Sequence, residues 1–197
     1  MSTTPEPSPD APEPRAGRTR RLVGRMIVLA VLITAVDQLT KYWAEKSLGD
    51  QAPVNVIGEF IQFRLLYNSG AAFSIGTGLT WLLTLIVVIV VIVVLRAATK
   101  IGSRGWAVAF GLLLGGAFGN LGDRLFRKPG FPEGHVVDFI DYGGFFVGNV
   151  ADIAIVAAAI MIAVLTLRGV GVDGRRHHAH GAGHRDEHDH GASTDEA

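Results

Sequence analysis

Four long apolar blocks restrict what this chain can fold into. They cover residues 22–44, 81–95, 105–122 and 150–167, and the second, WLLTLIVVIVVIVVL, has Thr84 as its only polar residue. A helix needs about 20 largely apolar residues to cross the core of a bilayer, and each block reaches that length with its flanks. Buried helices of a soluble bundle would carry polar stripes at helical spacing, which the second block lacks. We therefore predict an all-α membrane protein with four transmembrane helices.

The basic residues predict the orientation of these helices. Six Lys and Arg residues lie on one side of the predicted spans, and twelve lie on the other. Because cytoplasmic loops carry the excess of Lys and Arg, both termini are expected in the cytoplasm. The first block is too long for a typical signal-peptide core, and no small-residue cleavage site follows it. The cytoplasmic set is Arg15, Arg18, Arg20, Arg21, Arg25, Arg96, Lys100, Arg104, Arg168, Arg175, Arg176 and Arg185.

The two ends of the chain differ from the apolar blocks in composition. Residues 1–21 are rich in Pro, Ser, Thr and Arg, and residues 173–197 are rich in Gly, Asp and His. Such segments have little to bury, so we expect a disordered arm (1–21), a membrane domain (22–168) and a disordered tail (169–197). The tail could bind a metal loosely, but we interpret it as a solvated segment. Its histidines are His177, His178, His180, His184, His188 and His190.

Composition excludes two classes of function. The chain has no cysteine, which rules out thiol nucleophiles, disulfides and Cys-ligated metal sites. It has 18 Lys and Arg against 18 Asp and Glu, without the basic excess expected of a nucleic-acid-binding protein.

Two segments between the blocks are expected on the outer face. In residues 61–68, apolar and polar side chains nearly alternate, which predicts short strands at the membrane surface. The sequence Asn68-Ser69-Gly70 then indicates a turn. Residues 124–147 contain several Gly and Pro residues and are predicted to form a loop between the third and fourth spans.

Polar residues at membrane depth are candidates for function, because burying them in lipid is costly. Asp37, Thr40 and Lys41 fall at i, i+3 and i+4, on one face of the first span. We favour a structural ion pair between Asp37 and Lys41 that ties helices together.

The third span combines small and polar residues. Gly111, Gly115 and Gly119 are spaced for close helix packing. Gly119 shares a face with Gly116, Asn120 and Asp123, and Arg124 can neutralise Asp123. The fourth span opens with Asn149 and Asp152, which repeat the Asn-to-Asp spacing of Asn120 and Asp123.

A third carboxylate, Asp138, lies within the apolar run Val136-Val137-Asp138-Phe139-Ile140. It is either on the polar face of a surface strand or directed into an apolar pocket. The repeated Asn–Asp spacing favours pairing Asp123 with Asp152, whereas the apolar surroundings of Asp138 favour Asp138 with Asp152. Spacing alone leaves both pairs open.

Five motifs in order resemble the signature blocks of lipoprotein signal peptidase, also called signal peptidase II. The resemblance covers roughly residues 22–168. The motifs are Asp37-Gln38-x-Thr40-Lys41, Asn68-x-Gly70-Ala71-Ala72-Phe73-Ser74, Gly115-Gly116-x-x-Gly119-Asn120-x-x-Asp123-Arg124, Val137-Asp138-Phe139 and Asn149-x-Ala151-Asp152.

This resemblance implies a bacterial membrane aspartyl endopeptidase that removes signal peptides from diacylglyceryl-modified prolipoproteins. It cleaves before the lipidated cysteine, near the outer face of the cell membrane. The catalytic pair would be Asp138 and Asp152, which leaves Asp37, Lys41 and Asp123 with structural roles. Positions that match the substrate pocket are Asn68, Gly70, Asn120, Arg124 and Asn149.

The sequence departs from the family pattern in two places. Gly148 stands where the family usually has an aromatic residue, and the stretch between Asp138 and Asp152 is shorter than usual. Both departures affect the loop over the site, and neither removes a catalytic group.

The expected mechanism is that of two carboxylates sharing one proton. It needs no metal or cofactor. The partners are lipid-modified prolipoproteins and membrane lipids, with no nucleic acid, and we expect a monomer. The alternative is a four-helix transporter with an intramembrane Asp/Asn site, although the chain lacks inverted repeats or broken helices.

Overall fold

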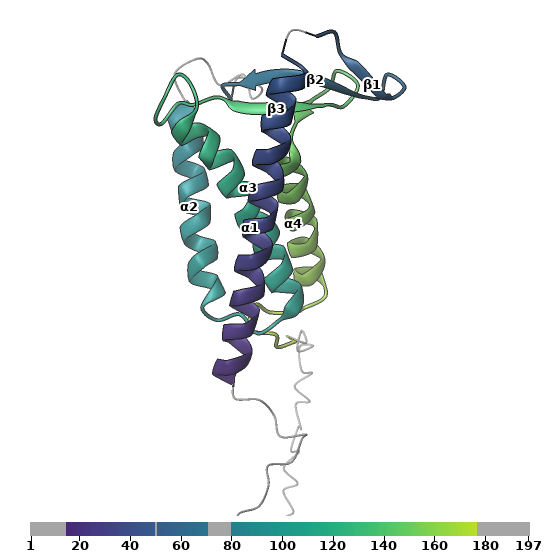
Figure 1. Ribbon diagram of the computed structural model, residues 1–197. Coiled ribbons are helices and arrows are strands. Elements are labelled where there is room, and N and C mark those ends of the chain that lie inside the picture. Colours follow the sequence, from purple (N-terminus) through teal and green to yellow (C-terminus); the bar gives the residue numbers. More distant parts are fainter. Residues whose placement is uncertain (1–14, 50, 71–79, 177–197) are drawn as a thin grey trace, which may run out of the picture.

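Four helices form the body of the protein. The computed structural model describes residues 15–49, 51–70 and 80–176. Helices α1 (Arg15–Ser47), α2 (Thr80–Ala98), α3 (Arg104–Phe126) and α4 (Val150–Leu167) run side by side (Figure 1). Each is long and apolar enough to cross a membrane, which confirms the four predicted spans.

Helix α3 is the centre of the bundle. In its most apolar stretch 61% of the residues are buried, against 22%, 22% and 17% in α1, α2 and α4. It packs mainly against α1 and α4. The other three helices therefore expose most of their apolar side chains on the outside, where a membrane would cover them.

Glycines explain how closely α3 approaches its neighbours. A Cβ at Gly115 would lie 2.9 Å from the Ala30 carbonyl oxygen of α1, and one at Gly116 would lie 2.5 Å from the Ala151 carbonyl oxygen of α4. Since real Cβ atoms do not approach other atoms so closely, only glycine fits at these points. Gly115 thus permits close packing of α3 against α1, and Gly116 permits it against α4.

A four-stranded antiparallel sheet covers one end of the bundle (Figure 1). Its strands follow the order β1 (Val54–Ile57), β2 (Ile61–Asn68), β3 (Val136–Asp141) and β4 (Val147–Gly148). The strand predicted from the alternating pattern is β2, whose bounds match the predicted ones.

The prediction that residues 124–147 form a loop is wrong where strands β3 and β4 lie. The β-branched and aromatic residues around Asp138 favour a strand, and β3 pairs with β2 in a register that places Leu66 opposite Asp138.

Aromatic side chains fix this sheet on the end of α1. The ring of Trp43, on α1, lies 5.5 Å from that of Phe63 on β2 and 6.2 Å from that of Phe139 on β3. Phe139 is buried together with Ala44 of α1 and with Leu48, which follows the end of that helix. This cluster holds β3, and with it Asp138, in a set position above the helices.

Part of each end that composition predicts to be disordered has regular structure. Helix α1 begins at Arg15 and so includes residues 15–21 of the predicted arm. This stretch contains no proline, and Gly17 is its one glycine. Residues 169–176, expected in the tail, form a hairpin that an isolated bridge between Val170 and Arg176 closes. The rest of the arm and tail, including all six tail histidines, and residues 71–74 of the second motif lie outside the described residues.

Candidate active site

Asp138 and Asp152 both contact Asn149 at the end of the bundle that carries the sheet. The Asn149 amide nitrogen Nδ2 donates to Asp138 Oδ1 (2.6 Å). The backbone N–H of Asn149 donates to Asp152 Oδ2 (3.1 Å), and its Oδ1 accepts from the Asp152 backbone N–H (3.0 Å). One residue therefore holds two carboxylates that come from β3 and α4.

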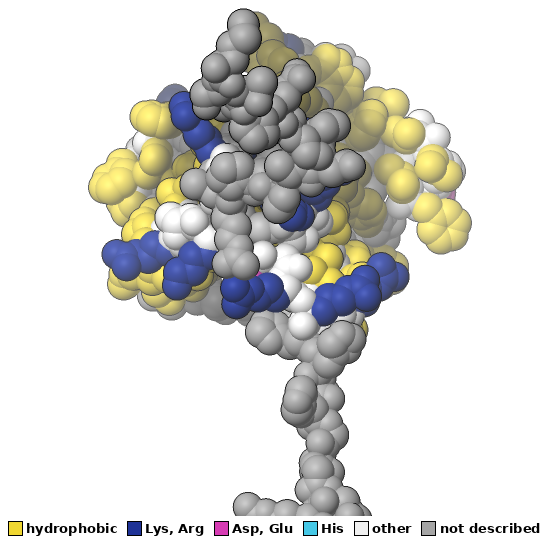
Figure 2. Space-filling model, turned by 90° about the horizontal axis from the view of Figure 1, so that it is seen from below, with side chains coloured by type: hydrophobic (Ala, Val, Ile, Leu, Met, Phe, Trp, Pro, Cys, Tyr) yellow, Lys and Arg dark blue, Asp and Glu magenta, His cyan; other side chains and the backbone are white. Residues whose placement is uncertain are grey.

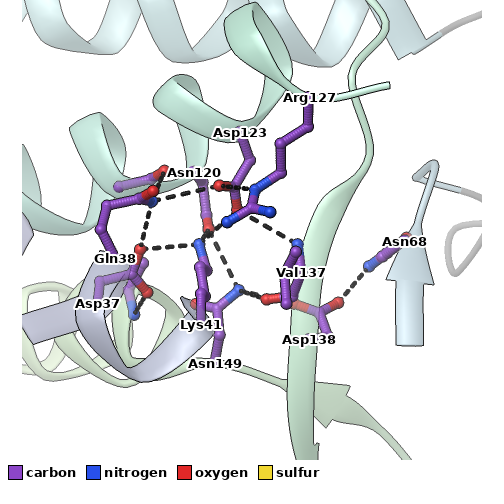
Figure 3. A network of polar contacts seen from close by, with 12 residues as sticks. Asp37, Gln38, Lys41, Asn68, Asn120, Asp123, Arg127, Val137, Asp138 and Asn149 are labelled. Atoms are coloured by element: carbon purple, nitrogen blue, oxygen red, sulfur yellow. Dashed lines mark hydrogen bonds and ion pairs between the residues drawn. The ribbon is translucent and has the colours of Figure 1, made fainter. Parts of the chain in front are cut away.

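Asp138 is almost completely buried, with 1% of its surface exposed. Its second oxygen, Oδ2, accepts a hydrogen bond from Asn68 Nδ2 (2.8 Å), so both oxygens have amide donors (Figure 3). Burial, together with the nearby charge of Asp152, raises the pKa of this carboxyl to about 6 against the opposing effect of the two amides. Asp138 is thus disposed to keep a proton that an ordinary aspartate would lose.

Asp152 lies in the first turn of α4. It is the third residue of the helix, and it forms a reciprocal capping box with Asn149. Its Oδ1 accepts from Asn120 Nδ2 of α3 (2.9 Å). The partial positive charge at a helix N-terminus favours an ionised carboxylate at this place.

A fully buried ion cluster of Asp37, Lys41 and Asp123 adjoins Asp138 and Asp152, hereafter the dyad; Figure 3 shows the cluster beside Asp138. Lys41 Nζ lies 2.8 Å from Asp37 Oδ2, 2.7 Å from Asp123 Oδ2 and 2.9 Å from Asn120 Oδ1. All three ammonium hydrogens thereby have acceptors. The contact to Asn120 orients the amide whose nitrogen donates to Asp152.

Asp37 extends the same support to α4. Its Oδ1 accepts from the backbone N–H of Ala151 (2.9 Å), which helix α4 leaves without a partner at its N-terminus. The predicted pair of Asp37 and Lys41 is therefore present. Thr40, placed on the same face by its spacing, instead donates to the Val36 and Asp37 carbonyl oxygens of its own helix.

Asp123 does not form its direct ion pairs with Arg124. Asp123 pairs with Lys41 and, through its Oδ1, with Nε of Arg127 (2.6 Å). Adjacent helical residues point in different directions, whereas residues four apart face each other. Asp123 Oδ2 also accepts from the Val137 backbone N–H (3.2 Å), which ties α3 to the strand that carries Asp138.

Arg124 has a different situation. It is buried, and its Nη1 is the one buried side-chain nitrogen or oxygen without a hydrogen-bond partner in the described part of the chain. Its Nη2 lies 3.9 Å from the place where a Cβ of Gly70 would be. A buried guanidinium N–H without a partner is costly, so this nitrogen is available to a ligand.

Gly70 and Asn68 form the turn that the sequence predicted. The backbone N–H of Gly70 donates to Asn68 Oδ1 (2.7 Å), while Asn68 Nδ2 faces Asp138. Gly70 has a φ of 95°, in the region that favours glycine. The turn therefore fixes the amide orientation with which Asn68 contacts Asp138.

The structure also explains why Gly148 is tolerated. A Cβ at this position would lie 2.6 Å from Phe146 Cε1 and 3.0 Å from Asp152 Oδ2. The ring of Phe146 thus fills the space beside residue 148, and it stacks on Tyr142 at 6.1 Å. The aromatic group absent at position 148 has a counterpart two residues earlier.

Sequence reasoning gave no role to three members of the cluster. Gln38 Nε2 donates to the Gly119 carbonyl oxygen (3.0 Å) and contacts both Asp37 and Asp123. Arg127 pairs with Glu45 of α1 as well as with Asp123. The four-residue spacing from Asp123 could have identified Arg127, but nothing local marks Glu45. Within residues 15–49, 51–70 and 80–176, no three His, Asp or Glu side chains are grouped as a metal site would require.

The fold and the site define a multi-pass membrane protein with two neighbouring carboxylates, Asp138 and Asp152, at one end of its bundle. A family profile described as "Signal peptidase (SPase) II" matches residues 29–168. The chain is 46% identical over 180 residues to a lipoprotein signal peptidase of Leifsonia xyli subsp. xyli, which covers 89% of this chain and 83% of that protein. It is 48% identical over 171 residues to one of Rhodococcus jostii, covering 87% and 85%. The chain belongs to the signal peptidase II family.

A solved structure supports the fold. A bacterial membrane enzyme determined by the in meso method at 1.9 Å resolution superimposes with a TM-score of 0.64 at 30% identity. The match covers 74% of this chain and 94% of the other.

Proposed function

We propose that this protein is an aspartic endopeptidase of the bacterial cell membrane that removes signal peptides from diacylglyceryl-modified prolipoproteins, cutting before the lipidated cysteine. Family membership supports the substrate class. The aspartic mechanism is supported by one observation, the convergence of Asp138 and Asp152 on Asn149. A transporter is not favoured, because the family and the relatives are peptidases.

In the proposed reaction Asp152 is the base and Asp138 the acid. Ionised Asp152 takes a proton from a water molecule, whose oxygen attacks the scissile carbonyl carbon. Protonated Asp138 donates a hydrogen bond to the carbonyl oxygen as its negative charge develops. When the tetrahedral intermediate collapses, the C–N bond breaks and the leaving amine takes up the proton held by Asp152.

The substrate-binding roles of the five proposed residues are not equal. The side chains of Asn120 and Asn149 already contact the two carboxylates, so they position catalytic groups. Arg124 retains an unpartnered Nη1 at the site. We therefore expect Arg124 to hold a substrate carbonyl oxygen, with the Gly70 turn beside it.

We also propose that the active site faces the outside and that both termini are cytoplasmic. The end of the bundle opposite the sheet carries the Lys and Arg side chains seen in Figure 2. Ten of the described ones there are exposed: Arg18, Arg20, Arg21, Arg25, Arg96, Lys100, Arg104, Arg168, Arg175 and Arg176. A cluster of this kind is typical of a cytoplasmic face.

The test is cleavage of a purified prolipoprotein in lipid bilayers, with and without the diacylglyceryl group. We expect cleavage before the cysteine of the lipidated substrate only. Equal cleavage of both forms would contradict the substrate assignment, and full activity of Asp138→Asn would contradict the aspartic mechanism.

A further inference from the structure

A second polar hollow lies at the opposite end of the bundle from the dyad. It has a volume of about 240 Å³. The residues that line it include Arg18, Thr19, Lys100, Gly102, Asp173 and Arg175. These residues come from the start of α1, the connection between α2 and α3, and the hairpin after α4. Three separate parts of the chain therefore build one site.

Specific contacts hold the hairpin in place. The backbone N–H of Gly102 donates to the Val172 carbonyl oxygen (2.9 Å), and the indole N–H of Trp106 donates to that of Val170 (2.8 Å). A Cβ at Gly102 would lie 2.1 Å from the Asp173 carbonyl oxygen, so only glycine permits this approach. The hollow is thus a product of the fold rather than of a loose tail.

Helix α1 forms the other wall. Thr19 Oγ1 donates to the Ile101 carbonyl oxygen (2.9 Å), which fixes the first turns of α1 against the α2–α3 connection. Arg18, the preceding residue, is thereby held beside Lys100. The wall would be lost if this part of the chain were the disordered arm that its composition predicts.

The charges of the hollow are not balanced. Asp173 pairs with Arg175 (3.4 Å), whereas neither Arg18 nor Lys100 forms an ion pair with a carboxylate of the described chain. Three cations and one carboxylate give a formal charge of +2. Like charges gathered without a counter-ion repel each other, which favours an anion between them.

We propose that this hollow binds the phosphate of an anionic phospholipid headgroup. Arg18 and Lys100 contact the phosphate oxygens, and Arg175, oriented by Asp173, closes the third side. The hollow lies where the helices end, at the level of lipid headgroups. Basic pockets between helices at this level are typical sites for anionic lipids. The bound lipid would join α1, the α2–α3 connection and the hairpin.

The test uses three variants in purified form. Arg18→Gln/Lys100→Gln removes two cations from the hollow, and Arg96→Gln/Arg168→Gln removes two exposed cations from the same end outside it. Gly102→Ala keeps every charge but displaces the hairpin. Prolipoprotein cleavage in phosphatidylcholine bilayers checks that each variant is folded.

Each protein is stripped of lipid, incubated with equal amounts of phosphatidylglycerol and phosphatidylcholine, and analysed by native mass spectrometry at physiological ionic strength. We expect one retained phosphatidylglycerol in the wild type and in Arg96→Gln/Arg168→Gln. Its affinity should fall roughly 5-fold for each cation of the hollow that is neutralised, whereas salt screens the scattered charges of the control. Gly102→Ala should also lose the lipid.

Equal lipid retention in the wild type and Arg18→Gln/Lys100→Gln would overturn the proposal. A second arm separates lipid phosphate from free phosphate by measuring the Tm in phosphatidylcholine with added inorganic phosphate. A stabilisation as large as that from phosphatidylglycerol would show that the site takes the free ion and would overturn the lipid assignment.

Discussion

The ammonium group of Lys41 lies 2.9 Å from the side-chain oxygen of Asn120, whose Nδ2 in turn donates to Asp152. Asn120 therefore links the buried cation of α1 to the proposed catalytic carboxylate of α4. The same ammonium group pairs with Asp37 and Asp123, so a fully buried ion cluster adjoins the dyad.

Lys41→Met should destabilise the protein by about 3–5 kcal/mol, because it leaves two buried carboxylates without their shared cation. Lys46→Met is the matched control, since Lys46 is exposed on the same helix, and it should change stability by less than about 0.5 kcal/mol. Denaturation in detergent measures both. Equal effects of the two substitutions would show that the cluster does not stabilise the fold.

The roles of the three aspartates can be separated by isosteric substitution. Asp138→Asn and Asp152→Asn should each lower the cleavage rate about 10²- to 10⁴-fold while the protein stays folded. Asp123→Asn should act mainly on stability, because Asp123 contacts Lys41 and Arg127 rather than the dyad. A stable but inactive Asp123→Asn, together with an active Asp138→Asn, would instead favour the pair Asp123 and Asp152.

Two glycines of α3 provide a test of helix packing. Gly116→Ala should destabilise by about 1–3 kcal/mol, because its Cβ would meet the backbone of Ala151 at 2.5 Å. Gly122→Ala is the control, since the nearest atom, Gln38 Nε2, is 4.0 Å away. Alanine there should leave stability unchanged or raise it slightly. Thermal unfolding of both variants gives the comparison.

The orientation is tested by a reporter fused after residue 197 that is active only outside the cytoplasm. It should remain silent, because the exposed Lys and Arg residues favour a cytoplasmic location of that end. A reporter inserted at Gly143, in the exposed turn between β3 and β4, should be active. The reverse pattern would place the dyad on the cytoplasmic side.

The sequence predicts the elements of this protein better than their contacts. The four spans and strand β2 follow from hydrophobic length and period, since these reflect the local environment of each residue. The spacing of Asp37 and Lys41 also predicts their pair, because both lie on one helix. Spacing cannot predict that Asn149 joins Asp138 and Asp152, since that contact depends on how β3 is placed above α4.

Adjacency in sequence was misleading in the case of Arg124. It follows Asp123 directly, yet Asp123 pairs with residues four positions along the helix and on α1. The ends were misjudged for a similar reason. Residues 15–21 and 169–176 have the composition of solvated segments, but Thr19, Trp106 and Gly102 fix them through contacts with distant parts of the chain.

The last prediction concerns the proton shared by the dyad. Asp138 is buried and its pKa is raised to about 6 from an ordinary 3.8, so it should be the protonated member at rest. Asp152 lies at the N-terminus of α4, where ionisation is favoured. Because Asp138 binds its proton more tightly in the folded than in the unfolded chain, it contributes stability at low pH. That contribution is lost as the pH rises through about 6.

Two measurements follow from this assignment. The value of kcat/KM should decline as the pH rises above about 6, where free Asp138 loses its proton. Infrared difference spectra should contain a protonated carboxyl band that Asp138→Asn removes and Asp152→Asn does not. The two groups titrate as a pair, so the band reports a preference between two microstates. Loss of the band in Asp152→Asn alone would show that Asp152 holds the proton, and the roles of acid and base would then be exchanged.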